Sequence, residues 1–200
     1  MSSDKQIWKP GTMLNPVPVV MVSCGTFGIK SNIITVAWTG TICTKPPMVS
    51  ISVRKERFSY DLIRNTGKFV INLVSKELVR AADWCGCRSG RNFDKFAEMK
   101  LTAKKAETSD CPVISESPVN IECSVVNVLE LGSHDLFIAK IDSVDVADYL
   151  IDTDTGALKL ERANLAVYCH GYYYEMGQEL GKFGYSVKKT VKSISKSSKK

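Results

Sequence analysis

The feature that most constrains the fold is a two-residue alternation near the middle of the chain. Between 119 and 130, apolar side chains at Val119, Ile121, Cys123, Val125 and Leu129 alternate with polar ones at Asn120, Glu122, Ser124 and Glu130. A period of two predicts a strand with one buried face. Leu131-Gly132-Ser133 then forms a turn, and a second strand is expected from about Asp135 to Val146. A long antiparallel hairpin of this kind suits a β-barrel.

The other elements support the same architecture. Short apolar runs predict strands at 17–23, 33–38, 48–53 and 68–74, while helical spacing predicts short helices at 57–65, 78–84 and 92–99. Gly67 is a plausible C-terminal stop for the first helix. Strands dominate, and βαβ alternation and internal repeats are absent. The sequence therefore predicts one mostly β domain with a few short helices and a closed β architecture.

The net charge is concentrated at one end of the chain. The formal charge is +6, but seven lysines and no acid lie between Lys182 and Lys200, so the remainder carries −1. A near-neutral body has no global bias toward nucleic acid. We expect a domain over 1–186 and a flexible Lys/Ser-rich tail over 187–200. Neither a membrane-length apolar run nor a secretory signal is present, so a cytoplasmic protein is expected.

Several kinds of site are disfavoured. The seven cysteines are odd in number and include no C-x-x-C pair, and there are only two histidines, so we expect free thiols and no metal. Rossmann, P-loop and G-x-S-x-G signatures are missing. Cys169-His170 are adjacent in sequence, which is not how catalytic Cys/His pairs usually arise, and we interpret the pair as structural or incidental.

Two polar clusters remain as candidate binding residues. The segment SNIITVAWTG places Asn32, Thr35, Trp38 and Thr39 along one expected strand, which either lines a site or is a half-exposed strand with a core tryptophan. The second cluster, RKERFSY from Arg54 to Tyr60, puts three cations before an expected helix with Ser59 as its N-cap. A helix N-terminus with cations suits a phosphate, although a solvated charged turn is the alternative.

These segments together resemble the flavoredoxin branch of the flavin reductase-like, FMN-binding split barrels. The N-x-x-T-x-x-W segment, the double-proline strand entry and the basic turn resemble the first half of that family. DWCGCRSGRNFDKFAEMKL resembles its C-G-x-x-S-G-x-x-x-D-K-F stretch, LGSHDLFIAKI its G-x-H hairpin, and GYYYEMGQELGKFGYSVKK its closing segment. The resemblance covers about residues 14 to 189 and implies a Greek-key split β-barrel.

The resemblance also implies roles for individual residues. The residues expected to line the flavin ring and ribityl chain are Asn32, Thr35, Ala37, Trp38 and Thr39, and those expected around the phosphate are Ser52, Arg54, Lys55 and Ser59. Lys95 would reach the flavin or its phosphate, and His134 would sit near the outer face of the ring, where a donor stacks. Tyr173 is expected to pack near the flavin, and Cys85 and Cys87 receive no role.

Three functions remain open from the sequence. The first is an FMN-binding oxidoreductase that passes electrons from NAD(P)H or another donor to an acceptor. The second is a flavoredoxin-type electron carrier serving a redox protein partner, and the third is a non-redox β-barrel binding module. A homodimer with the flavin site at its interface is expected by analogy with the family.

Overall fold

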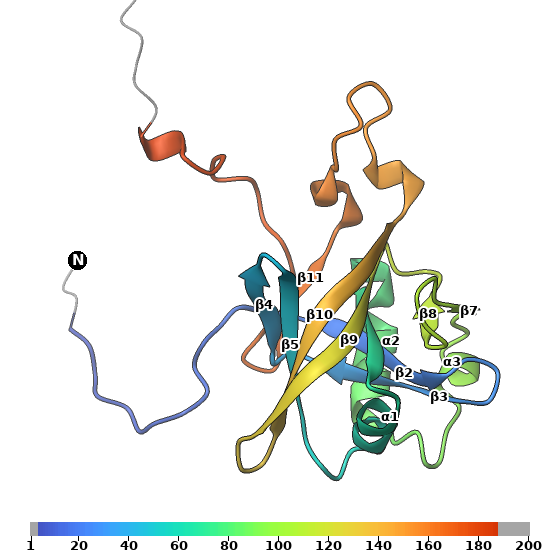
Figure 1. The fold of residues 1–200 in the computed structure, drawn as a ribbon. Coiled ribbons are helices and arrows are strands. Elements are labelled where there is room, and N and C mark those ends of the chain that lie inside the picture. The colour runs from blue at the N-terminus through green and yellow to red at the C-terminus, as the bar shows by residue number, and fades with distance from the viewer. Residues whose placement is uncertain (1–3, 188–200) are drawn as a thin grey trace, which may run out of the picture.

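A single curled antiparallel sheet forms the body of the molecule in the computed structural model, which describes residues 4–187. Seven strands are hydrogen-bonded in the order β3-β2-β6-β9-β10-β5-β4, with the helices on the outside (Figure 1). Their bounds are β2 Val20–Thr26, β3 Lys30–Val36, β4 Thr39–Thr44, β5 Pro47–Val53, β6 Lys68–Leu73, β9 Val119–Glu130 and β10 Asp135–Val146.

The two edge strands of this sheet are consecutive in the chain. β3 ends at Val36 and β4 begins at Thr39, so only Ala37 and Trp38 separate the opposite edges. The Ser52 backbone N–H donates to the Trp38 carbonyl oxygen at 2.9 Å. No ladder pairs β3 with β4 among the described residues, so the barrel is split along this seam. The mostly β, split-barrel prediction is confirmed, and the seam carries two of the expected site residues.

The helices pack against the strands next to the seam. α1 (Phe58–Thr66) contacts β2 and β3, as does α2 (Val79–Cys87), and the short α3 (Lys95–Glu98) contacts β3. Gly67 ends α1 with a φ of 64°, which a residue without a Cβ adopts at little cost. The expected N-cap at Ser59 is wrong: Arg57 occupies that position without a side-chain bond, and Ser59 lies inside the first turn.

Shorter elements complete the body. A three-stranded sheet has the order β1-β11-β12, and a two-stranded sheet pairs β7 with β8. These strands and the 3-10 helices are β1 Val17–Pro18, β7 Ala103–Lys105, β8 Pro112–Ile114, β11 Ala166–Cys169, β12 Tyr172–Glu175, η1 Lys76–Leu78, η2 Asp148–Leu150, η3 Leu160–Ala163 and η4 Tyr185–Val187. The structure gives no long helix among the described residues that could span a membrane.

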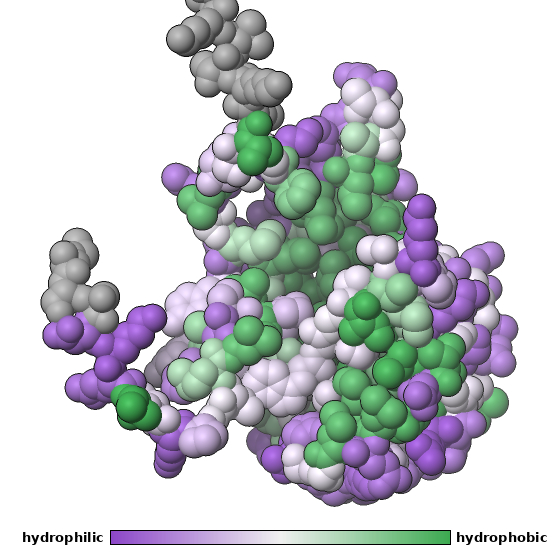
Figure 2. Space-filling model, turned by 60° about the vertical axis from the view of Figure 1, so that its left-hand side comes forward, coloured by the Kyte–Doolittle hydropathy of each residue, from purple (hydrophilic) through white to green (hydrophobic). Residues whose placement is uncertain are grey.

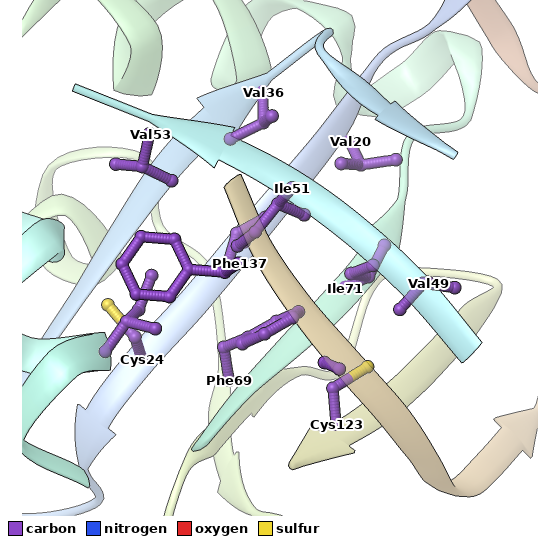
Figure 3. Close-up of a cluster of buried hydrophobic side chains, with 13 residues drawn as sticks. Val20, Cys24, Val36, Val49, Ile51, Val53, Phe69, Ile71, Cys123 and Phe137 are labelled. Carbon is purple, nitrogen blue, oxygen red and sulfur yellow. The ribbon is translucent and has the colours of Figure 1, made fainter. Parts of the chain in front are cut away.

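Apolar side chains from six strands and helix α1 meet inside the barrel (Figure 3). Phe69 from β6 and Phe137 from β10 are fully buried at its centre, beside Ile51 from β5. Burying a phenylalanine contributes about 1.5–3 kcal/mol relative to leaving it exposed. A second cluster, including Met21 and Ile33, fills the space between the outer face of β2 and β3 and helix α2. Strands β2 and β3 are thus held from both sides.

The expected one-sided burial of the central hairpin is wrong in its first half. Asn120 and Glu122, placed by alternation on an exposed face, are 8% and 1% exposed. The Glu122 carboxylate accepts the backbone N–H groups of Glu107 and Thr108 at 2.7 and 2.8 Å, and Asn120 donates to Asn72 Oδ1 at 2.7 Å. A loop over 106–111 covers this face, so its polar side chains are buried with partners.

Strand β4, the tail and the cysteines complete the comparison with the sequence-based expectations. Strand β4 was not expected, because TGTICT lacks an apolar alternation, and most of its residues remain exposed or half-buried at the sheet edge. The expected flexible tail at 187–200 lies, except for Val187, outside the described residues. All seven cysteines are unpaired, and Cys24, Cys85, Cys111 and Cys123 are buried.

Candidate functional site

A small hollow with an excess of positive charge lies between β3, the start of α1 and the loop after α2. Its volume is about 170 Å³. Four cations and one carboxylate line it, together with hydroxyl and amide groups. We call it the basic hollow, and its lining residues are Asn32, Ile34, Glu56, Arg57, Phe58, Ser59, Cys85, Gly86, Arg88, Ser89, Gly90, Arg91 and Lys95.

Lys95 is the least ordinary member of this lining. Lys95 is the first residue of helix α3, and it is buried, with 4% of its surface exposed. The ammonium group donates to the carbonyl oxygens of Ile33 at 2.7 Å and Cys85 at 2.6 Å, and no described carboxylate pairs with it. Burial lowers the pKa of Lys95. A buried cation without a counter-ion is costly, so this position favours an anionic ligand.

Asn32 and Ser59 stand beside this lysine. The Asn32 amide donates to the Ser59 hydroxyl oxygen at 2.8 Å, which joins β3 to the first turn of α1. Gly90 lies against Asn32 and Phe58, since a Cβ built there would come 2.5 Å from Asn32 Cγ and 2.8 Å from Phe58 Cδ1. The loop can therefore approach Asn32 this closely only with a glycine at 90.

A second hollow, of about 440 Å³, lies at the seam of the barrel. We call it the tryptophan hollow; its lining residues are Ile34, Thr35, Val36, Ala37, Trp38, Ser52, Val53, Arg54, Arg57, His134 and Tyr168. Ile34 and Arg57 also line the basic hollow, so the two adjoin. Trp38 is partly exposed, and His134 lies at the hairpin turn with its Nδ1 2.9 Å from the Ser133 hydroxyl oxygen.

The expected site residues fall into three groups. Asn32, Ser59 and Lys95 line the basic hollow, whereas Thr35, Ala37, Trp38, Ser52, Arg54 and His134 line the tryptophan hollow. Thr39 and Lys55 line neither. The Thr39 hydroxyl donates to the Ser50 carbonyl oxygen at 2.8 Å, and Lys55 pairs with Glu130 and Asp135.

Tyr173 is separated from both hollows. Its hydroxyl donates to Asp83 at 3.0 Å, and its ring packs edge-on against Tyr168 with the ring centroids 5.7 Å apart. Tyr168, which the sequence reasoning missed, is the aromatic residue that reaches the tryptophan hollow from this side. Tyr173 supports that residue.

Of the three arginines that line the basic hollow, one was singled out from the sequence. Arg57 belongs to the cluster already noted, but Arg88 and Arg91 received no role. Arg91 donates to the Glu56 carbonyl oxygen at 2.9 Å and lies over the Phe58 ring, with its guanidinium carbon 5.7 Å from the ring centroid. Both arginines lie in the stretch that resembles C-G-x-x-S-G-x-x-x-D-K-F, which is the signal that could have found them.

The thiols at the site are not nucleophiles. Burial raises the pKa of Cys85 to about 11 and that of Cys24 to about 12, so both stay protonated near neutral pH. No group of three or more His, Cys, Asp or Glu side chains within residues 4–187 could hold a metal ion. The arrangement provides a cationic hollow joined to an aromatic one.

Comparison with known proteins gives the family. The model of the "Flavin reductase like domain" matches residues 12–176. The chain belongs to the flavin reductase-like family. Flavoredoxin of Desulfovibrio vulgaris (Miyazaki F) superposes with a TM-score of 0.85 at 31% identity, over 92% of this chain and 100% of the flavoredoxin. These matches confirm the resemblance and support a flavin-related redox function.

Two other relatives extend the comparison. Flavoredoxin from Methanosarcina acetivorans shares the fold, with a TM-score of 0.83 at 24% identity over 93% of this chain and 100% of that one. The high molecular weight rubredoxin of Moorella thermoacetica is 25% identical over 107 residues, which make up 52% of this chain and 45% of the rubredoxin. This chain therefore matches less than half of the Moorella protein.

Proposed function

We propose that this chain binds FMN and passes electrons from NAD(P)H or another donor through it to an acceptor, as a flavin reductase does. The observation that carries the proposal is the buried Lys95 ammonium, which lacks a counter-ion among the described residues and faces a hollow lined by three arginines. A phosphate monoester carries nearly two negative charges and several acceptor oxygens near neutral pH. It fits four cations offset by one carboxylate.

The residues present also fit the rest of the cofactor. The tryptophan hollow adjoins the basic hollow through Ile34 and Arg57, so one elongated ligand can occupy both. Trp38 offers an aromatic face and Ser52 a hydroxyl group at the seam, whereas the Thr35 hydroxyl already donates to the Ala82 carbonyl oxygen. When bound, FMN supplies the two-electron redox chemistry, and the protein supplies position and electrostatics.

The residues of the chain then bind the cofactor and orient the donor. Lys95, Arg57, Arg88 and Arg91 hold the phosphate, and the Asn32–Ser59 pair fixes polar groups beside it. His134 lines the tryptophan hollow from the hairpin turn, where its ring can orient a donor by a hydrogen bond. Neither an acid nor a base is required from the protein, which agrees with the lack of a catalytic pair among the lining residues.

A flavoredoxin-type electron carrier is the second candidate. Supporting observations are the 31% identity to a flavoredoxin over nearly the whole chain and the local similarity to a rubredoxin-containing protein. A carrier would exchange electrons with a protein instead of a nicotinamide. Anaerobic titration separates the two: NADH or NADPH bleaches the bound flavin of a reductase, whereas a carrier requires a reduced redox protein.

A homodimer is part of the proposal. Apolar side chains are exposed on the extended segments at both ends of the described chain, including Ile7, Trp8, Leu180 and Phe183. Both segments project from the body (Figure 1), and hydrophobic side chains are gathered over a large part of the face in Figure 2. Light scattering of the flavin-loaded protein should give about twice the chain mass of 22.1 kDa. A flavin-binding monomer would contradict this.

The deciding experiment is purification followed by analysis of the bound cofactor. A yellow protein that releases FMN on denaturation, identified by mass, supports the proposal. Recovery of FAD alone would overturn the choice of FMN; its adenosine would need the open hollow beside Phe58, lined also by Lys30 and Asn92. A protein that neither contains nor takes up a flavin would instead be a non-redox binding module.

A further inference from the structure

Asp135 is a fully buried carboxylate with an incomplete set of partners. Asp135 is 0% exposed, and its Oδ2 accepts a hydrogen bond from the Tyr60 hydroxyl at 2.6 Å. Oδ1 accepts no hydrogen bond and is one of two buried side-chain polar atoms in the described chain in that state. The atom lies 3.6 Å from Lys55 Nζ. Burying a carboxylate is unfavourable unless it is paired, so an arrangement of this kind needs a reason.

The position of Asp135 supplies that reason. It is the first residue of β10, directly after His134, and pairs in register with Val53, the last residue of β5. The chain between β5 and α1, residues 54–57, therefore starts beside Asp135. Tyr60 lies in the first turn of α1, so the same carboxylate also contacts the far side of this loop.

The loop over 54–57 carries two arginines of the candidate site. Arg57 lines both hollows, and Arg54 lines the tryptophan hollow. Lys55 points elsewhere: its ammonium lies 3.1 Å from Glu130 Oε2 as well as 3.6 Å from Asp135. Glu130 and Asp135 thus both pair with Lys55. The lysine charge therefore lies beside the β9–β10 hairpin and does not line the basic hollow.

We propose that Asp135 is a positioning residue that holds the 54–57 loop at both ends, through Lys55 and Tyr60, and so places Arg57 for the cofactor phosphate. This inference rests on the proposed FMN binding. Lys55 is then the counter-ion of Asp135 and not a phosphate contact. Because the hairpin turn with His134 ends at Asp135, the carboxylate also ties the donor end of the site to the phosphate end.

The test compares FMN with riboflavin, which has the same ring but lacks the phosphate. Flavin fluorescence titrations would be made with the wild-type protein, Asp135→Asn, Arg57→Ala and the double variant. Asp142→Asn is the matched control, because Asp142 is an ion-paired carboxylate on the same strand, contacting Lys68 and remote from the loop. Tyr60→Phe, which removes only the hydroxyl, serves as a second variant if Asp135→Asn fails to fold.

We expect Asp135→Asn to weaken FMN binding about tenfold and to leave riboflavin binding within about twofold, with Arg57→Ala adding little to the double variant. Asp142→Asn should leave the affinity for both flavins unchanged. Equal weakening of both flavins, an additive double variant, or unchanged FMN affinity would each overturn the inference. A wild-type protein that binds neither flavin would instead refute the proposed function, and the inference with it.

Discussion

Replacing Lys95 by methionine distinguishes the contribution of its charge to FMN binding from the effect of that buried charge on stability. Met fills a similar volume but removes the ammonium group that donates to the Ile33 and Cys85 carbonyl oxygens. A hydrogen bond from a charged donor contributes about 1.5–3 kcal/mol. Losing one to the phosphate should therefore weaken FMN binding about tenfold to a hundredfold.

The stability of the flavin-free protein should respond much less. Two carbonyl oxygens lose a donor, which is destabilising, but a buried cation without a described counter-ion is removed, which is stabilising. We expect the free energy of unfolding to change by less than about 2 kcal/mol. Chemical denaturation measures this change, and Lys105→Met, at an exposed ion-paired lysine, is the control for loss of a surface charge.

The pH dependence gives an independent measurement of the same charge. Burial holds the pKa of Lys95 below its usual 10.5, so the flavin-free folded state loses this proton more readily than the unfolded chain. Its stability should rise as the pH increases through that lowered pKa toward 10.5, because the cost of the buried charge is relieved. FMN affinity should fall over the same range, since the phosphate requires the ammonium.

Both pH effects should vanish in Lys95→Met. The assays are flavin fluorescence titration and urea unfolding at a series of alkaline pH values. Wild-type FMN affinity in a folded Lys95→Met protein would refute the assignment of this lysine to the site. An affinity loss that is equal for riboflavin and FMN would refute the assignment to the phosphate.

Three further predictions use the same assays. Asn32→Ala should weaken FMN binding about tenfold to a hundredfold without unfolding the chain, and unchanged affinity would remove Asn32 from the site. Gly90→Ala should weaken FMN binding by displacing Asn32 or Phe58, from which the new Cβ would be 2.5–2.8 Å away; wild-type binding and thermal stability would show that the loop shifts freely. His134→Ala should leave FMN affinity nearly intact but slow reduction by the donor about tenfold to a hundredfold in anaerobic stopped-flow measurements, and a wild-type rate would make it only a turn residue.

The strands that the sequence predicted are those with a hydrophobic reason to form. The central hairpin and β5 were located almost to the residue because their apolar side chains meet in the barrel. β4 was missed because an edge strand at the seam buries little, so its side chains carry no period. The burial of Glu122 was missed because the loop that covers it is distant in sequence and has no pattern of its own.

The site was predictable where it lies on regular elements or in recognisable motifs. Asn32 was noted in a polar cluster and Lys95 came from the resemblance, and the structure brings them into one hollow. Arg88 and Arg91 lie in a loop where spacing carries no information about direction. Lys55 illustrates a different problem, because its position in a run of cations suggested a phosphate contact. The pairing of β10 with β5 brings Asp135 to 3.6 Å from the Lys55 ammonium, which only three-dimensional register reveals, and the phosphate contact stays a prediction.

The distribution of charge also favours one orientation of a ligand in the site. Of these two hollows, Lys95, Arg88 and Arg91 line the basic one and not the other, whereas Trp38 and His134 line the tryptophan hollow and not the basic one. An elongated ligand with a phosphate at one end and an aromatic ring at the other is therefore favoured in one orientation. Arg57 lines both hollows, so its charge would act on a bound phosphate while its side chain borders the hollow proposed for the ring. A change at Arg57 should alter both binding and reduction, whereas changes at Lys95 or His134 should alter chiefly one of them.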